Sequence, residues 1–175
     1  KLINSPRKSQ PINFAYIPEF LRLGTAVDDF TYQDYTIIGC ENSKKFKKCK
    51  NIYKHFSKNI FEMKLSEAEM AKHIANIYVA TSVSFIAEMT KLAEKMNINL
   101  LPVSKALRYD KRIGKKSYIL PGLGFTGGNL ERDINVIKNL LKKYGEKSVF
   151  LNAVTKTNDY HNNIIIRKLE KIFKN

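Results

Sequence analysis

Residues 66–101 read SEAEMAKHIANIYVATSVSFIAEMTKLAEKMNINLL, and this stretch decides the fold. It contains neither proline nor glycine, so it predicts one helix of roughly 30 residues, about 45 Å long at about 1.5 Å per residue. Ser66 and Glu69 have the S-x-x-E spacing of a capping box, which indicates that the helix begins at Ser66. Between Ile74 and Ile86 the helix is apolar on nearly every side, so we expect its own domain or a partner chain to bury it.

Shorter patterns precede this helix. The apolar runs at residues 14–17 and 35–39 end at Pro18 and at a glycine, which is typical of buried strands in a small sheet, and the segment between them is expected to be a loop. Residues 43–58 place apolar side chains, Ile52 among them, at helical spacing opposite a row of lysines, which predicts an amphipathic basic helix. Residues 1–13 lack any period and are expected to lead into the fold.

The C-terminal half also reads as helical. Pro102 suits the first turn of a short helix ending near Arg108, residues 109–128 are irregular and rich in glycine and lysine, and a further helix is closed by Gly145. After the apolar run 149–151, residues 152–173 predict one more helix with Leu169 and Phe173 on its apolar side. The predicted fold class is therefore mainly α with a small β-containing N-terminal part, an α+β arrangement.

Charge and composition restrict the function. The 175 residues carry a net charge of +15, so the surface attracts polyanions. The basic face from Lys44 to Lys54, with Tyr53 and Phe56 interleaved, is compatible with nucleic-acid binding, but no nucleic-acid module accompanies it, so this alternative is disfavoured. Two cysteines and three histidines indicate neither a disulfide framework nor a metal site.

Location and chain ends follow from the same composition. No apolar stretch approaches the ~20 residues needed to cross a bilayer, and no signal peptide is evident. We therefore expect a cytoplasmic protein that does not associate with membranes. The first residue is lysine rather than methionine, so the chain is expected to begin inside a longer gene product or after processing.

Residues 122–127, GLGFTG, fit the G-x-G-x-x-G pattern of a dinucleotide-binding turn. A helix follows them, and the run 149–151 is placed where a second strand is needed. The preceding strand would comprise only residues 118–120, and no clear acidic residue stands at the ribose position. A dinucleotide-binding turn is therefore the weaker of two interpretations of these glycines.

Four motifs occur in a fixed order: PEFLRLGTAVDDF at 18–30, AEMAKHIAN at 68–76, RIG at 112–114 and GFTGGNLERD at 124–133. In this order they resemble the UDP-glucose and GDP-mannose 6-dehydrogenase family, the nucleotide-sugar dehydrogenases. The resemblance covers residues 14–134 well and the remainder loosely. It implies that the glycines of 122–127 contact a sugar rather than a cofactor.

The resemblance implies an organisation into three parts. Residues 1–60 would be the end of an NAD-binding Rossmann-like domain with its substrate loop. Residues 61–150 would be a central helical dimerisation domain of the 6-phosphogluconate-dehydrogenase-like type, and 151–175 a helix leading toward a C-terminal nucleotide-binding domain. A homodimer through the helix from Ser66, NAD as cofactor and a nucleotide sugar such as UDP-glucose as substrate are implied in the same way.

At one position this sequence lacks the residue that the implied chemistry uses. The family oxidises C6 of the sugar twice, and a cysteine thiolate captures the aldehyde between the two steps. Here Asn129 occupies that position, and neither Cys40 nor Cys49 falls in the motif. Oxidation that stops at the aldehyde, attack by water on a bound hydrate, and loss of catalysis all remain open. In the last case the chain would be a non-catalytic dimerisation or sugar-nucleotide-binding module.

The resemblance assigns roles to individual residues. Lys72 and Asn76, one helical turn apart, would hold an oxyanion or a water, with Glu19 as general acid/base and Asp133 supporting the water. Arg112 would reach the substrate of a neighbouring subunit. His73 is expected to be a core histidine. The implied substrate contacts are Phe20, Leu21, Arg22, Tyr118, Leu120, Gly122, Gly124, Phe125 and Thr126, and the implied cofactor contacts are Leu23, Asn129 and Arg132.

Overall fold

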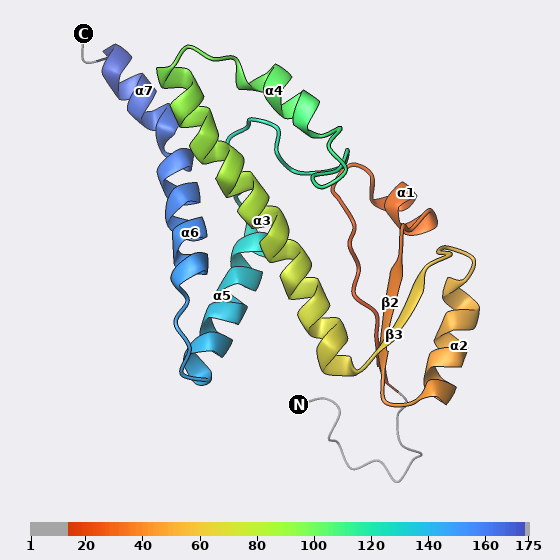
Figure 1. Ribbon diagram of the computed structural model, residues 1–175. Coiled ribbons are helices and arrows are strands. Elements are labelled where there is room, and N and C mark those ends of the chain that lie inside the picture. The colour runs from red at the N-terminus through yellow and green to blue at the C-terminus, as the bar shows by residue number, and fades with distance from the viewer. Residues whose placement is uncertain (1–13, 174–175) are drawn as a thin grey trace. The chain divides into compact units, whose positions relative to one another are not determined.

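The computed structural model describes residues 14–173, and the predicted N-terminal leader lies outside this range. The chain forms two compact units, Lys1–Lys72 and His73–Asn175, and the boundary falls within helix α3 (Leu65–Lys95). Figure 1 shows the elements of both units, coloured by residue number. The mainly α fold class with a small sheet is confirmed, whereas the three-part domain division stays a prediction.

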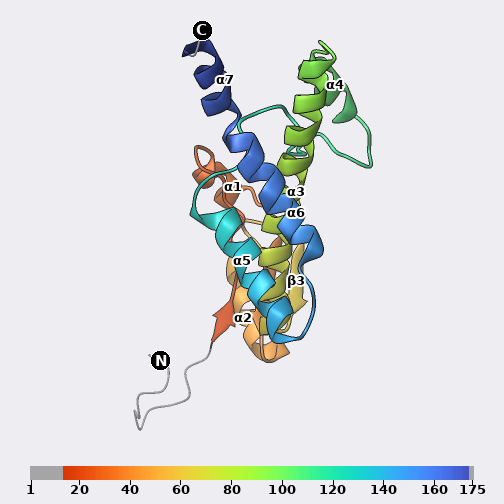
Figure 2. The ribbon, with the colours of Figure 1, turned by 90° about the vertical axis from the view of Figure 1, so that its left-hand side faces the viewer.

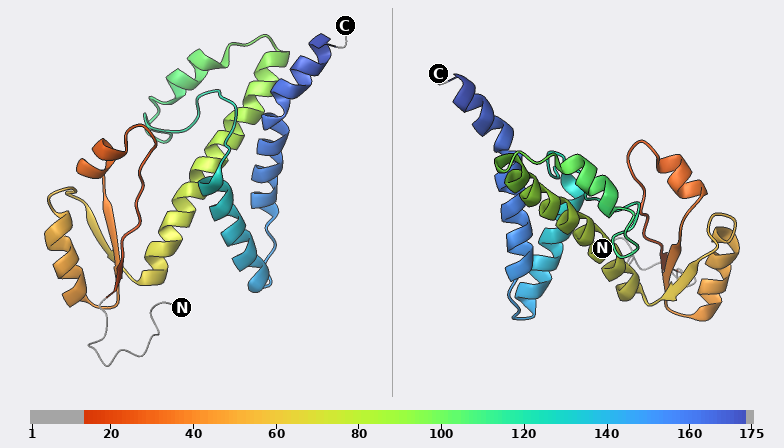
Figure 3. Two further views of the ribbon diagram at one scale, coloured as in Figure 1. Left: turned by 180° about the vertical axis from the view of Figure 1, so that it is seen from behind. Right: turned by 45° about the horizontal axis from the view of Figure 1, so that its top comes forward.

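The first unit contains a three-stranded sheet in the order β1-β2-β3. Strand β1 (Ala15–Tyr16) runs antiparallel to β2 (Thr36–Cys40), and β2 runs parallel to β3 (Ile60–Met63). A parallel pair requires a crossover connection, which helix α2 (Ser43–Tyr53) supplies. All five residues of β2 are buried, so this strand is the centre of the unit (Figure 3).

Helix α2 has the predicted amphipathic character. Phe46 packs into the core with Ile38 and Cys40, and the Asn42 side chain caps the helix by accepting a hydrogen bond from the Lys45 backbone N–H at 3.1 Å. The helix ends at Tyr53, short of the predicted residue 58, and Ile52 is exposed rather than on the packed face. Burial raises the pKa of the Cys40 thiol.

Two elements of this unit were not predicted. The segment expected to be a loop contains the short helix α1 (Ala26–Thr31), and β3 had no sequence signal. Strand β3 is four residues long and only partly buried, so its pattern carries little periodicity. It is a strand because β2 offers a parallel partner, with Thr36 opposite Ile60.

The start of α3 differs from the prediction in its capping residues. The Lys64 carbonyl accepts the first helical hydrogen bond from Ala68, and the Lys64 N–H donates to the Glu67 carboxylate at 2.8 Å. Lys64 is therefore the cap residue, and Glu67 makes the return bond expected of Glu69. The helix begins at Leu65, one residue before the predicted Ser66, and extends over 31 residues, as its sequence indicated.

Within residues 73–173, the regular structure of the second unit is entirely helical. Together with most of α3 it contains α4 (Leu100–Leu107), α5 (Gly128–Lys143), α6 (Val149–Asn162) and α7 (Ile164–Phe173). Figures 1 and 2 show α5 and α6 alongside α3. One residue of α3, Ala80, meets residues of both other helices in the core, which comprises Ala80, Phe125, Ile134, Leu151 and Val154.

The predicted end of α5 is confirmed. Gly145 has φ +78°, a left-handed conformation that glycine adopts without a steric penalty. Its N–H donates to Lys142 O at 3.2 Å, and the Glu146 N–H donates to Leu141 O at 2.8 Å. These two bonds form a Schellman motif, which satisfies carbonyls at the helix end.

One prediction for the C-terminal part is wrong, because the single helix expected over 152–173 is interrupted at Asn163 between α6 and α7. The run 149–151, which the dinucleotide interpretation requires as a strand, is the first turn of α6. Residues 118–120 form no strand either. The dinucleotide interpretation of residues 122–127 is therefore wrong, because no strand flanks the glycines. No helix within residues 14–173 is long and apolar enough to cross a membrane.

A glycine allows α3 to approach the sheet closely. A Cβ added at Gly39 would lie 2.7 Å from the Ala68 Cβ and 3.2 Å from the Tyr16 carbonyl oxygen. Gly39→Ala should therefore lower the free energy of unfolding by about 2 kcal/mol, the usual scale of overpacking. The measurement is urea unfolding followed by circular dichroism.

The matched test is a double-mutant cycle with Ala68→Gly. Removing the Ala68 methyl group frees the space that the new methyl group needs, so the double variant should lose less than the sum of the two single losses. Strict additivity would contradict the close approach.

Candidate active site

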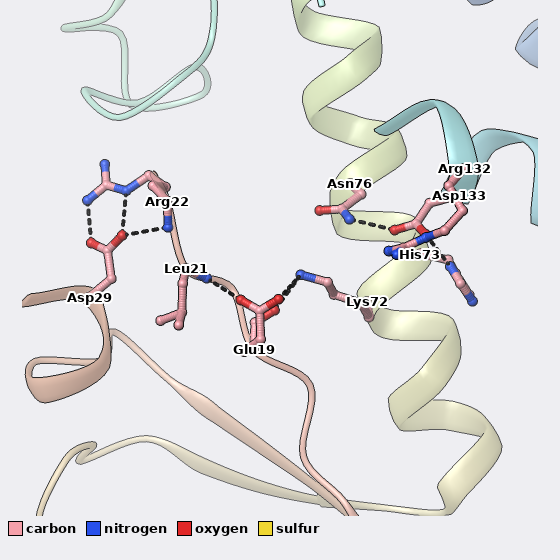
Figure 4. A network of polar contacts seen from close by, with 9 residues as sticks. All are labelled: Glu19, Leu21, Arg22, Asp29, Lys72, His73, Asn76, Arg132 and Asp133. Carbon is pink, nitrogen blue, oxygen red and sulfur yellow. Dashed lines mark hydrogen bonds and ion pairs between the residues drawn. The ribbon is translucent and has the colours of Figure 1, made fainter. Parts of the chain in front are cut away.

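In the first unit, a loop carboxylate lies against a lysine 53 residues away in sequence. The Lys72 ammonium donates to the Glu19 backbone carbonyl and lies 3.6 Å from Glu19 Oε1. Glu19 Oε2 accepts from the Leu21 N–H at 2.8 Å, which fixes the carboxylate (Figure 4). The ammonium also stands 5.1 Å from the centre of the Phe20 ring, a cation–π distance. The expected general acid/base and the expected catalytic lysine are thus in contact.

Arg22 attaches the same loop to Asp29 of helix α1. Its guanidinium donates to the Asp29 carboxylate at 2.6 and 3.0 Å, and its backbone N–H adds a third bond at 3.0 Å (Figure 4). These hydrogen bonds hold the pKa of Asp29 well below its usual range. The interaction ties the loop to α1, so Arg22 has a structural partner in addition to its expected role toward substrate. The role of Asp29 was missed because it depends on α1.

In the second unit, Asp133 is a carboxylate with no exposed surface. Its Oδ2 accepts from the Asn76 side-chain amide at 2.5 Å, and its Oδ1 lies 3.1 Å from Arg132 Nε and 3.4 Å from His73 Nδ1 (Figure 4). Burial of an ionised carboxylate is costly unless donors surround it. The structure thus brings together three of the expected site residues and adds His73.

Helical spacing explains the addition of His73. It precedes Asn76 by three residues on α3, so both side chains project from one face of the helix. The four-residue spacing of Lys72 and Asn76 predicts their shared face, whereas the apolar surroundings of His73 in the sequence predict a core histidine. The position of Asp133 on α5 shows that Asn76 and His73 share a partner.

Residues 122–127, called the glycine segment below, are held in place by side chains of α6. The Asn158 carboxamide accepts from Phe125 N and donates to Phe125 O, both at 2.8 Å. Asn162 donates to the same carbonyl at 3.1 Å, and His161 Nε2 lies 2.7 Å from Gly122 O. Because this segment belongs to no sheet, these side chains supply the hydrogen bonds that buried backbone groups require. The three α6 residues were not predicted as site residues, although two asparagines one helical turn apart were a possible signal.

The remaining expected site residues lie at the surface. The Arg112 guanidinium donates hydrogen bonds to the Asp110 carboxylate at 2.6 and 3.0 Å, which lowers the pKa of that carboxyl. The Arg112 side chain is 89% exposed. Asn129 is the second residue of α5, exposed, and one turn before Asp133. Leu23, Tyr118, Leu120 and Thr126 are also exposed.

Comparisons with known proteins agree with these motifs. The model of the UDP-glucose/GDP-mannose dehydrogenase central domain matches residues 66–160, and the model of that family's NAD-binding domain matches residues 1–57. The chain belongs to this family. The second of these models describes an NAD-binding domain, so NAD is the cofactor of the family to which this chain belongs.

Individual relatives support the assignment. A UDP-glucose 6-dehydrogenase of Rickettsia bellii is 33% identical over 165 residues, which are 93% of this chain and 38% of the relative. The structure of a UDP-glucose dehydrogenase from Pyrobaculum islandicum has a TM-score of 0.85 at 31% identity, covering 91% of this chain and 37% of that one. A UDP-D-ManNAc dehydrogenase from Pyrococcus horikoshii, at 22% identity and a TM-score of 0.73, shares the fold, with 93% and 38% covered. The chain thus spans less than two-fifths of these family members.

The described residues of this family member do not by themselves fit NAD. A dinucleotide cradle requires a strand, a glycine-rich turn and a helix N-terminus in succession. Within residues 14–173 the glycine-rich segment has no preceding strand, and the connection from β2 to α2 lacks the glycine pattern. Leu23 offers an exposed apolar side chain, which has no group to hydrogen-bond a ribose. These residues thus lack a pyrophosphate cradle.

A methyl group at Gly124 should break the attachment of the glycine segment to α6. Gly124 has φ +91°, and its added Cβ would lie 2.7 Å from Asn158 Oδ1, with the Asn162 carboxamide also in the way. Gly124→Ala is expected to lower the free energy of unfolding by about 3 kcal/mol, combining backbone strain and steric overlap. Thermal and urea unfolding measure this.

Gly114→Ala is the matched control. Gly114 has φ +90° but nothing within 4 Å of an added Cβ, so it carries the backbone strain alone, about 1 kcal/mol. Equal losses for the two variants would show that the α6 side chains impose no constraint on Gly124.

Proposed function

We propose that the protein containing this chain is an NAD-dependent nucleotide-sugar 6-dehydrogenase that oxidises a UDP sugar such as UDP-glucose. The chain would supply residues that bind the sugar and move protons at its C6. The observation that carries the proposal is the contact of Lys72 with Glu19, two residues that the family motifs single out and that lie 53 positions apart. Family membership and the substrate named for the relatives support the substrate class.

Lys72 is proposed to stabilise negative charge that develops on the C6 oxygen. An ammonium held by a backbone carbonyl and a carboxylate is already oriented, so little reorganisation is needed when the oxyanion forms. Glu19 is proposed as the general acid/base. Its exposed carboxylate can reach water, while the Leu21 N–H keeps it in one orientation.

Asn76 and Asp133 are proposed to serve the same reaction. The Asn76 carboxamide has one N–H on Asp133, which leaves its oxygen and second N–H for a ligand or water. Arg112 is proposed to bind phosphate or hydroxyl groups of a substrate on a neighbouring subunit, since its exposed guanidinium is preorganised by Asp110.

The substrate contacts are proposed to come from two segments. Phe20, Leu21 and Arg22 belong to the loop that Asp29 fixes. Gly122 to Thr126 belong to the segment that α6 fixes, with Tyr118 and Leu120 just before it. Backbone groups in a fixed, exposed segment can bind sugar hydroxyls with little loss of conformational entropy. Leu23, Asn129 and Arg132 are the proposed cofactor neighbours.

A second candidate is a sugar-nucleotide-binding or dimerisation module without catalysis. It is favoured by one observation, the carboxamide of Asn129 at the position of the family's nucleophile. An amide nitrogen does not attack an aldehyde, so no covalent intermediate forms there.

Asn129→Cys separates these two functions. With UDP-glucose and NAD, the full-length wild-type protein is expected to release aldehyde or to form acid slowly. The variant should raise the yield of acid relative to aldehyde at least tenfold, because a thiolate can retain the aldehyde for the second oxidation. Chromatography of the products measures the ratio.

Asn129→Ser is the control, with similar size and no thiolate. Binding of UDP-glucose without NADH formation in any variant would identify the non-catalytic module. Absence of both binding and NADH formation, with GDP-mannose and N-acetylated sugar nucleotides as well, would refute the proposed function.

We also propose that α3 pairs with α3 of a second copy. Five large apolar side chains are between 55% and 64% exposed, at spacings of four and seven residues, four on one side of this helix and one just after its last residue. They form a continuous stripe: Ile74, Tyr78, Phe85, Leu92 and, after the helix, Met96. A two-fold axis would bring the same stripe of two chains together.

Phe85→Glu should convert the dimer to a monomer, because it places a charge at the centre of the buried stripe. Sedimentation equilibrium measures the change as at least a 100-fold rise in dissociation constant. Asn139→Glu, an exposed site on α5, introduces the same charge and should leave the dimer intact. A monomeric wild type, or a dimeric Phe85→Glu variant, would contradict this interface.

A further inference from the structure

The two ring nitrogens of His73 have different surroundings. Nδ1 is buried, has no hydrogen-bond partner among the described residues, and lies 3.4 Å from Asp133 Oδ1. The side chain as a whole is 25% exposed, and the described residues make no hydrogen bond to Nε2, which is not buried. One nitrogen therefore faces a buried carboxylate, and the other is accessible.

The buried contact determines which nitrogen carries the proton. Asp133 accepts from Asn76 and from Arg132, so it is the ionised acceptor of this cluster. A lone pair on Nδ1 facing the carboxylate without water would be repelled. The neutral imidazole therefore carries its proton on Nδ1 and leaves the lone pair on Nε2. At 3.4 Å the two atoms approach without forming a hydrogen bond, and catalytic hydrogen bonds are often unformed or long in an unliganded site.

No other member of the cluster can accept a proton at the surface. Asp133 has no exposed surface, so it cannot touch a reacting water itself. The Asn76 amide is not a base, and the Arg132 guanidinium is always charged. Asn129, one turn before Asp133 on α5, is exposed but is neither a base nor a nucleophile. The accessible lone pair belongs to His73 Nε2.

We propose that His73, oriented by Asp133, is a general base that adds water to the C6 aldehyde of the bound sugar. Nε2 takes a proton from water while the water oxygen bonds to the carbonyl carbon, and the π pair moves onto the carbonyl oxygen. That oxygen then takes a proton from the imidazolium. The aldehyde becomes its hydrate, His73 returns to neutral, and no oxidant is consumed. This inference rests on the proposed function.

The step fits the substitution at Asn129. Without a thiolate the aldehyde is not trapped as a thiohemiacetal, and a hydrate is the form that still carries a hydrogen on C6 and two oxygens. Hydration by His73 would therefore replace covalent capture in this chain.

The first test measures the tautomer. Long-range proton–nitrogen NMR of the full-length protein at alkaline pH should show the Nδ1–H form for His73. His161 is an internal reference, because Nε2 must donate to Gly122 O at 2.7 Å and so must be the Nε2–H form. An Nε2–H form at His73 would overturn the proposal. In Asp133→Asn the preference at His73 should weaken while that of His161 persists.

The second test measures hydration without NAD. The C6 aldehyde of UDP-glucose exchanges its carbonyl oxygen with ¹⁸O-labelled water through the hydrate, and mass spectrometry follows the exchange. The full-length protein should accelerate exchange over buffer, and His73→Gln should lower the acceleration about 100-fold, the scale of general base catalysis. Glutamine can still donate to Asp133, so the fold is preserved. His55→Gln, at an exposed histidine of the first unit, should change nothing.

The outcomes separate this inference from the proposed function. UDP-glucose binding by calorimetry without accelerated exchange, or equal exchange in the wild type and His73→Gln, overturns the role of His73 alone. Failure to bind any sugar nucleotide overturns the proposed function and this inference with it, whatever tautomer the NMR spectrum reports.

Discussion

Burial of a 31-residue helix is the constraint on which both units depend. Helix α3 carries apolar residues along most of its length, and its first turns and the remainder belong to different units. Its first turns pack on the sheet, where Gly39 leaves space for Ala68. Farther along, small residues again allow close packing: Ala80 joins the core with α5 and α6, and the Ser84 hydroxyl donates to Val154 O at 3.1 Å. The apolar residues left exposed form the stripe proposed to meet a second copy.

The buried carboxylate of Asp133 links this packing to chemistry. A charge with no exposed surface persists only where polar groups replace its hydration, and α3 provides the Asn76 amide as a donor and places His73 Nδ1 3.4 Å away. These two α3 residues are also proposed to act on substrate. Stability of the packed helices and orientation of the polar groups therefore have one origin, and a change at Asp133 must affect both.

The glycine segment and the residues before it are likewise held by side chains from a distant part of the sequence. Residues 109–127 form neither helix nor strand, so their backbone groups need partners from elsewhere. Asn158, His161 and Asn162 provide them, and Gly124 is required because α6 side chains fill the space that a Cβ would occupy. A segment without secondary structure thereby gains a defined shape, which is the property that a binding loop requires.

Local signals in the sequence by themselves determined the long helix α3, the basic helix α2, the Gly145 cap of α5 and, through motifs in a fixed order, the family. The two helices and the cap each depend on residues within a few positions of one another, where periodicity and capping act, and each family motif is itself a short local string. Only the tertiary structure decided strand β3, the cap at Lys64, the break at Asn163 and the roles of His73 and the α6 asparagines. Each of these is set by a partner distant in sequence or by competition between neighbouring local signals, so no periodicity or motif in one segment could reveal it.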